Sequence, residues 1–340
     1  MRIFSADTSR VGAATALVGG GSGAREIARA VREQGADVVH AHNMLPLIGP
    51  RGLAAARDAG AKVVLHLHNV RLFCATGFGE RNGAPCSRCR GRHTLPGLML
   101  NCRRSVPEAV AYAAGLSLHQ PRVTESVDRF VTPSDFASSR VAQLGLPGER
   151  VETLRHYLPE EAFADSSRAG QGEYALVAAR LSPEKGIDQA VSAAAGAGMP
   201  LRIVGDGPDR DRLEALADRA GSPVALLGRL PPAGVRDLLA GAAAVLMPSH
   251  YHEFSPYAAL EAMAQGVPVV ATAMGGLPEL LGADRTVARD EPDGLAIRLA
   301  SLWKDPEARE AEGQALLERA RERHGRERYV RELLDLYGRL

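Results

Sequence analysis

The stretch over residues 244–281 constrains the fold of this chain more than any other. It opens with a short apolar run, residues 245–247, whose length suits a buried strand. Ser255 and Pro256 then predict a helix start, because a serine hydroxyl can cap the first turn and proline fits the first helical position. Residues 267–271 are a second apolar run, so the stretch predicts a strand, a helix and another strand in succession.

Two carboxylates lie in this stretch, Glu253 before the predicted helix and Glu261 inside it. The helical rise from Ser255 to Glu261 is roughly 9 Å, about the span of a diphosphate. A nucleotide sugar lying along the helix could therefore meet Glu253 with its sugar and Glu261 with its ribose. Its phosphates would lie near the amides around Phe254, Ser255 and Pro256, where the helix dipole favours anions. The alternative is a solvated glutamate on an amphipathic helix, but the small apolar neighbours of Glu261 favour a ligand pocket.

Two cations upstream also suit a diphosphate. Arg180 and Lys185 follow the apolar run 174–178, at a predicted strand end and ahead of a predicted helix. Arginine can hold phosphate oxygens in bidentate fashion, and lysine acts as a point charge. A surface charge cluster is the alternative. Gly205 and Gly207 lie in the next strand-to-helix turn, where glycine allows a backbone to approach a ligand closely.

From residue 37 onward, strand and helix patterns alternate regularly. This alternation predicts an α/β fold with parallel sheets and crossover helices. The predicted strands include residues 37–42, 62–68, 128–132, 151–157, 174–178 and 201–204. His42 and His68 fall at strand ends, where open α/β sheets place ligands. A histidine at such a place is more often structural than catalytic, so both readings stay open.

Two stretches are rich in small and polar residues. Residues 1–4 could form an edge strand, whereas we interpret residues 5–23 as a flexible linker rather than a phosphate-binding loop, because their glycines do not follow a convincing strand. Residues 24–34 then predict a helix. Residues 159–172 are the second such stretch and the best candidate for a linker between domains.

All four cysteines lie in one segment, spaced as C-x11-C-x2-C-x12-C. Cys86 and Cys89 have the spacing of a zinc knuckle, and Cys74 and Cys102 could complete a tetrahedral structural site. In a cytoplasmic protein this pattern favours metal binding over disulfides, with reduced cysteines in a flexible loop as the alternative. Arginines crowd the same segment, where they could face an anionic acceptor, a membrane phosphate or only solvent.

The sequence E-F-S-P-Y-A-A-L-E-A-M-A-Q-G-V-P-V-V-A-T, followed by G-G-L-P-E, resembles the donor-binding signature of the retaining family-4 glycosyltransferases. That signature is two glutamates with seven residues between them. The resemblance extends from about residue 36 to the C-terminus. It implies the GT-B fold, in which two Rossmann-like domains with parallel sheets face each other and a nucleotide sugar binds in the cleft between them.

The resemblance also implies roles for single residues. Arg180 and Lys185 would neutralise the leaving diphosphate without a metal, and Arg229 lies where the base is held. His68 would contact the donor sugar from the N-terminal domain, so His68 and Glu253 are the predicted catalytic residues. No protein nucleophile is expected. In the family a longer N-terminal region precedes this point, and we expect it to be shortened in this chain.

A length of 340 residues suits two domains that each bury a core. The first is an acceptor-side Rossmann-like domain over 1–158 with the Cys-rich segment 74–102. A linker over 159–172 leads to the nucleotide-sugar domain over 173–322. A C-terminal helix over 323–340 would return to the first domain.

The formal net charge of +1 gives no general attraction to nucleic acid. No apolar run reaches the roughly 18 residues of a membrane span, and no signal peptide is recognisable, so a cytoplasmic protein with some peripheral membrane contact is expected. The expected partners are a UDP- or GDP-sugar donor and an unidentified acceptor, anionic or lipid-linked, and catalysis should need no cofactor. Two alternatives stay open: a truncated, non-catalytic protein that binds a nucleotide or a partner, and a sugar-nucleotide epimerase.

Overall fold

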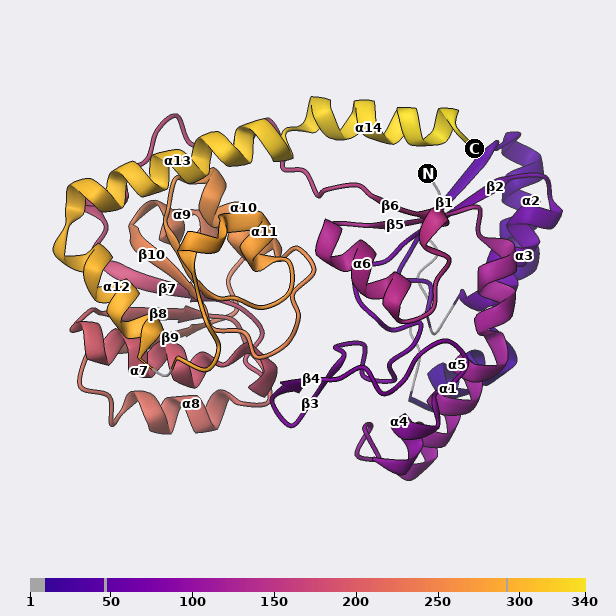
Figure 1. Ribbon diagram of the computed structural model, residues 1–340, viewed down its shortest axis with the longest axis horizontal. Coiled ribbons are helices and arrows are strands. Elements are labelled where there is room, and N and C mark those ends of the chain that lie inside the picture. Colours follow the sequence, from indigo (N-terminus) through magenta and orange to yellow (C-terminus); the bar gives the residue numbers. More distant parts are fainter. Residues whose placement is uncertain (1–9, 46–47, 292) are drawn as a thin grey trace. The chain divides into compact units, whose positions relative to one another are not determined.

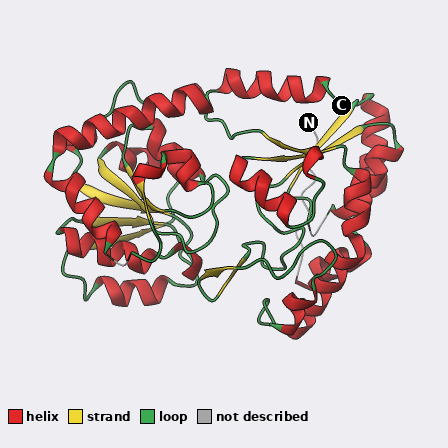
Figure 2. Cartoon of the chain, viewed as in Figure 1, coloured by secondary structure: helices red, strands yellow, loops and turns green. Residues whose placement is uncertain are grey.

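The computed structural model of the chain describes residues 10–45, 48–291 and 293–340 (Figure 1). Contacts between residues divide it into two compact units. The N-terminal unit comprises Met1–Arg81, Pro85–Leu154 and Leu333–Leu340, and the C-terminal unit comprises Asn82–Ala84 and Arg155–Glu332. Each unit is built on a parallel sheet with helices packed against it (Figure 2). The predicted α/β fold with parallel sheets is therefore confirmed.

The main sheet of the N-terminal unit has four parallel strands in the order β1-β2-β5-β6. They are β1 (Val38–His42), β2 (Lys62–His66), β5 (Arg129–Thr132) and β6 (Val151–Thr153). The packed helices include α2 (Ala24–Gln34), α3 (Gly49–Asp58), α5 (Val106–Ser126) and α6 (Asp135–Gln143). Val64 and Phe130 in the two central strands are fully buried, as expected for a parallel sheet that helices cover.

The glycine-rich beginning of the chain differs from the predicted flexible linker, because it contains the helix α1 (Arg10–Gly19). Leu17 in this helix is 2% exposed and belongs to a small apolar cluster. The turn that follows is tight: Gly21 has a φ of 97°, and a Cβ there would lie 2.0 Å from the carbonyl oxygen of Ile48. Glycine thus permits a close backbone contact here and does not loosen the chain. The edge strand predicted over 1–4 lies outside the described residues.

The sheet of the C-terminal unit has six parallel strands in the order β12-β11-β10-β7-β8-β9. They are β7 (Tyr174–Ala178), β8 (Leu201–Val204), β9 (Val224–Gly228), β10 (Ala242–Met247), β11 (Val269–Thr272) and β12 (Thr286–Val287). The helices include α7 (Ile187–Ala197), α8 (Arg210–Ala217), α9 (Pro232–Ala240), α10 (Tyr257–Ala264), α11 (Leu277–Leu281), α12 (Gly294–Lys304) and α13 (Pro306–His324). One apolar core joins the sheet to α10 and α13, and a second joins it to α7 and α12. The strands are therefore buried on both faces, as in a doubly wound sheet.

The stretch 159–172, predicted as a linker from its composition, packs on the C-terminal unit. The hydroxyl of Ser167 donates to the carbonyl oxygen of Gly266 at 2.6 Å. The buried guanidinium of Arg309 donates to the carbonyl oxygen of Ala169, also at 2.6 Å. The small and polar residues of this stretch therefore allow its backbone to pack closely against other parts of the unit.

The chain ends in the helix α14 (Arg326–Gly338), whose last residues group with the N-terminal unit. There the Tyr337 hydroxyl lies 2.8 Å from His40 Nδ1 in β1. Among the helices of the described residues, none combines the length and the apolar character that a membrane crossing requires.

Candidate functional site

A pocket of about 800 Å³ lies in the C-terminal unit, where β7, β8 and β9 end. Arg180 after β7 and Arg229 after β9 line it, together with Gly205 and Gly207 after β8 and Glu261 from α10. Ligands of open α/β sheets bind at the carboxyl ends of the strands, and this volume is typical of a small-molecule site. The structure therefore brings five of the predicted binding residues together in one pocket.

The glycine turn after β8 also makes close contacts within the protein. Gly205 has a φ of 137°, and a Cβ on it would lie 1.8 Å from the carbonyl oxygen of Ala179. A Cβ on Gly207 would lie 2.2 Å from the carbonyl oxygen of Leu181. The loop after β7 thus packs directly on these glycines. This close approach of the protein's own backbone holds the loop that carries Arg180 beside the pocket.

The helix α10 begins later than predicted, at Tyr257. Pro256 occupies the N-cap with an extended ψ of 128°, and no side chain caps the helix. The predicted Ser255 cap is therefore wrong, because the chain is still extended at Pro256 and the serine lies one residue too early. Phe254 and Ser255 are buried, and neither they nor Pro256 line the pocket.

The Glu261 carboxyl lies half-buried in the pocket wall. Burial raises the pKa of Glu261, and the nearby Arg236 partly offsets the shift. A partly desolvated carboxylate gains most from hydrogen-bond donors that a ligand brings. Glu261 is thus suited to accept hydrogen bonds from hydroxyl groups.

Glu253 is a buried carboxylate with three hydrogen-bond donors, and it does not line the pocket. Lys185 Nζ lies 2.7 Å from its Oε1, and the Ser249 hydroxyl donates to the same oxygen at 2.8 Å. The Tyr251 hydroxyl donates to Oε2 at 2.7 Å. Burial, followed by the neighbouring Glu253, raises the pKa of Tyr251, which keeps this hydroxyl protonated as a donor. Lys185 is therefore the counter-ion of Glu253 as well as a candidate phosphate ligand.

The backbone of Glu253 rests on the glycine pair that precedes α11. Gly276 N donates to the Glu253 carbonyl oxygen at 2.7 Å. Gly275 has a φ of 68°, and a Cβ on it would lie 2.2 Å from the same oxygen. Sequence reasoning found the glycine pair but missed this support, and it also missed Ser249 and Tyr251. Their hydroxyl groups, four and two residues before Glu253, are the sequence feature that could have indicated these hydrogen bonds.

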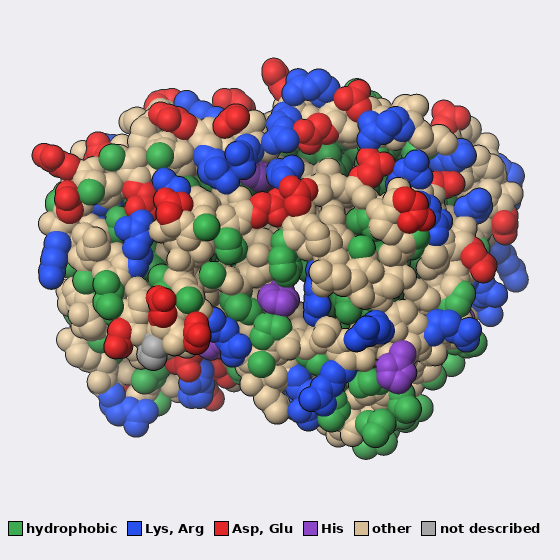
Figure 3. All heavy atoms as spheres, viewed as in Figure 1, with side chains coloured by type: hydrophobic (Ala, Val, Ile, Leu, Met, Phe, Trp, Pro, Cys, Tyr) green, Lys and Arg blue, Asp and Glu red, His purple; other side chains and the backbone are tan. Residues whose placement is uncertain are grey.

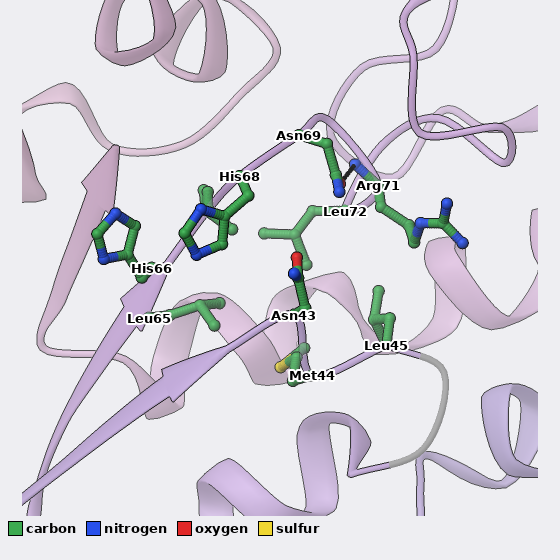
Figure 4. A pocket seen from close by; sticks show the side chains of 10 residues that line it. Asn43, Met44, Leu45, Leu65, His66, His68, Asn69, Arg71 and Leu72 are labelled. Atoms are coloured by element: carbon green, nitrogen blue, oxygen red, sulfur yellow. Dashed lines mark hydrogen bonds between the residues drawn. The ribbon is translucent and has the colours of Figure 1, made fainter. Parts of the chain in front are cut away.

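A second pocket, of about 260 Å³, lies in the N-terminal unit at the end of β2 (Figure 4). His66 and His68 line it, with parallel rings whose centroids are 4.5 Å apart. His42 at the end of β1 places its Nδ1 2.9 Å from His68 Nε2. Burial lowers the pKa of His42, so this ring is held neutral and can orient His68 through that hydrogen bond.

Cys74, Cys86, Cys89 and Cys102 line a third, much smaller cavity of the N-terminal unit. All four are free thiols.

On the face that Figure 3 draws, positive and negative side chains are interspersed, in keeping with the balanced composition.

Two family models match the chain, one on each side of the boundary between the units. The model described as "Glycosyl transferase 4-like domain" matches residues 5–155, and "Glycosyl transferases group 1" matches residues 159–319. The putative colanic acid biosynthesis glycosyltransferase WcaL of Salmonella typhimurium is 31% identical over 192 residues, 52% of this chain and 47% of the relative. The D-inositol 3-phosphate glycosyltransferase of Kribbella flavida is 29% identical over 325 residues, 86% of this chain and 69% of the relative. The match to the first of these thus spans about half of that relative's length.

Solved structures agree in fold. HepE of Anabaena, crystallised with UDP, has a TM-score of 0.68 at 17% identity, covering 93% of this chain and 82% of its own. Sucrose-phosphate synthase from Thermosynechococcus elongatus has a TM-score of 0.70 at 16% identity, covering 93% and 76%. At such identities these likenesses establish the fold, and they confirm the predicted one. With a glycosyltransferase model matching each unit, the chain belongs to the family-4 glycosyltransferases of the GT-B fold.

Proposed function

We propose that this chain transfers a sugar, with retention of configuration, from a nucleoside-diphosphate sugar to an acceptor hydroxyl. One observation carries the proposal: Arg180, Glu261 and the glycine turn between them in sequence line one pocket at the carboxyl ends of parallel strands. Structural neighbours crystallised with UDP and with UDP-glucose support a uridine donor as the first to test, with a GDP-sugar as the other.

The pocket supplies the groups that a donor needs. Arg180 is exposed and forms no ion pair with any described residue, so its guanidinium is available for a diphosphate. Glu261 would accept hydrogen bonds from the ribose hydroxyls, and Arg229 would lie beside the base. These cations and the carboxylate would hold the donor without a metal.

Glu253 and Lys185 would act together at the sugar and the phosphate. Three donors already saturate much of the Glu253 carboxylate, which makes it a poor nucleophile and a well-fixed acceptor for a sugar hydroxyl. The Lys185 ammonium has three N–H groups, and Glu253 and Tyr251 take two of them. The third would be left for a phosphate oxygen.

His68 would contact the sugar from the N-terminal unit, as the family resemblance implies. In the transfer, a bond forms between the acceptor oxygen and the anomeric carbon while the bond to the phosphate breaks. The acceptor proton leaves with the nucleoside diphosphate. We assign no nucleophile, and retention then requires attack on the face from which the phosphate departs. The arginines of the Cys-rich segment make anionic and lipid-linked acceptors the first to screen.

The binding half of the proposal is tested by calorimetry on the full chain with UDP and GDP. Arg180→Met and Glu261→Gln should each lose about 1.5–3 kcal/mol of binding free energy, roughly a 10- to 150-fold weaker Kd. Arg219→Met is the matched control, because it removes an exposed arginine of the same unit that does not line the pocket. Equal affinity in wild type and both pocket variants would remove this pocket from the donor site.

The catalytic half is tested by transfer assays and by the anomeric configuration of the product. His68→Ala should keep the nucleotide affinity of the wild type and lose transfer, because His68 contributes from the N-terminal unit only. An inverted product would refute retention. Conversion of the donor sugar without any acceptor would indicate an epimerase, and binding without transfer across a broad acceptor panel would indicate a non-catalytic protein.

A further inference from the structure

The four cysteines converge on one enclosed space although three separate stretches of chain supply them. Cys74, Cys86, Cys89 and Cys102 all line a cavity of about 20 Å³. A single water needs roughly 10–15 Å³ measured in this way, so the space fits one atom-sized guest. Thiol sulfurs are soft ligands of the kind that bind zinc, a closed zinc site takes four of them, and four cysteines line this one small space.

Backbone hydrogen bonds hold the cysteines at this cavity. Cys74 N donates to the carbonyl oxygen of Val70 at 2.9 Å, and Cys86 N donates to that of Gly79 at 2.7 Å. Cys102 N donates to the carbonyl oxygen of Gly97 at 3.1 Å. Each of the three stretches is therefore fixed close to its cysteine.

The part of this segment over residues 76–104 has no buried hydrophobic side chain, whereas Val70, Leu72, Phe73 and Ala75 before it are buried. Its regular elements are the two-residue strands β3 (Glu80–Arg81) and β4 (Ala84–Pro85) and the five-residue helix α4 (Leu95–Met99). Two large apolar side chains of α4 are exposed, Leu95 by 51% and Met99 by 75%. A stretch that buries so little apolar surface is of the kind that metals or disulfides commonly stabilise.

The charges around the cavity suit a thiolate cluster. Zinc with four thiolates carries a net charge of −2, which needs compensation when it is shielded from water. The Arg81 guanidinium lies beside the Cys102 thiol. Arg140 donates to the Cys86 carbonyl oxygen at 2.9 Å, and its guanidinium lies near Cys86 and Cys74. Two cations thus stand beside the two charges that the cluster would carry.

We propose that Cys74, Cys86, Cys89 and Cys102 bind one zinc ion that orders the segment over residues 70–104. No three of the sulfurs lie within 4.8 Å of one another, whereas tetrahedral zinc with Zn–S of about 2.3 Å requires S···S separations of about 3.8 Å. Binding would therefore draw the four side chains together. The site is independent of the donor pocket, and its role is structural because no coordination position stays open.

The test is elemental analysis of the full chain purified without added metal. About one zinc per chain is expected, and Cys86→Ser combined with Cys89→Ser should reduce it at least tenfold. His42→Ala is the control, because His40, His42 and His66 place ring nitrogens within 4.8 Å of one another and are the rival zinc ligands in the N-terminal unit. This control should keep its zinc.

If the cysteine variant does not fold, the wild type still decides the question. A mercurial that reacts with thiols should release the zinc stoichiometrically, and a chelator should raise the number of rapidly titrating thiols to four. A folded, metal-free wild type with four titrating thiols overturns the proposal. So does a disulfide found by mass spectrometry, or zinc that survives the mercurial or the cysteine substitution.

Discussion

Lys185→Met tests whether the ion pair with Glu253 holds the loop after β10 in place. The Glu253 side chain is 6% exposed and that of Lys185 is 20% exposed, with 2.7 Å between Nζ and Oε1. Removing one partner of a buried pair costs about 3–5 kcal/mol, because the other charge stays buried and uncompensated. The hydroxyls of Ser249 and Tyr251 still donate to Glu253, and the lysine is partly exposed, so we expect the lower end, about 3 kcal/mol.

A double-mutant cycle separates the interaction energy of the Lys185–Glu253 pair from the effects of the two single substitutions. Glu253→Gln removes the buried charge, and the lysine can turn its ammonium toward water, so this change should cost only about 1 kcal/mol. Lys185→Met combined with Glu253→Gln no longer buries a charge and should be more stable than Lys185→Met alone by about 2 kcal/mol.

The single tryptophan, Trp303 in α12, lies in the same unit as the pair and provides the assay. Its fluorescence during thermal unfolding reports on the C-terminal unit. A loss of about 3 kcal/mol should lower the Tm of Lys185→Met by roughly 6–12 °C in a unit of this size. A Lys185→Met protein within about 0.5 kcal/mol of the wild type would refute the reasoning, as would a double variant no more stable than Lys185→Met.

The remaining predictions concern pH and the glycine pair. Burial lowers the pKa of His324 to about 4, so the stability that its neutral ring contributes is fully present above pH of about 6.5 and is lost as the pH falls toward 4, by up to about 3 kcal/mol. His324→Gln should flatten that part of the stability profile, and an unchanged slope would contradict the assignment. Gly275→Ala should destabilise the C-terminal unit more than Gly198→Ala, since both have a left-handed φ but only the first Cβ meets a neighbour, at 2.2 Å. Equal losses in chemical denaturation would mean that the contact with Glu253 does not matter.

The sequence by itself determined the alternation of elements and much of the candidate site. The predicted strands 174–178 and 201–204 and the helix 24–34 have the same bounds in the structure, because apolar runs and turn residues act over a few neighbouring positions. Arg180 could be placed at the pocket because it follows the end of β7, and parallel strands bring their ends to one edge of the sheet. Glu261 lies inside α10 and was predicted from its spacing along the helix and its small apolar neighbours. The cysteine spacing likewise predicted their convergence.

Only the tertiary structure decided which groups meet across the chain. Lys185 and Glu253 are 68 residues apart, and their pairing depends on β7 and β10 being neighbours in the sheet. The backbone contacts of Gly205 with Ala179 and of Gly275 with Glu253 could not be predicted from the local sequence. Residues 10–19 read as a linker, yet form a helix that buries Leu17. Local sequence patterns reflect the interactions of a residue with its neighbours along the chain. These contacts depend instead on strand order and loop packing, which bring together residues that are distant in sequence. The local sequence around either residue therefore does not identify its partner.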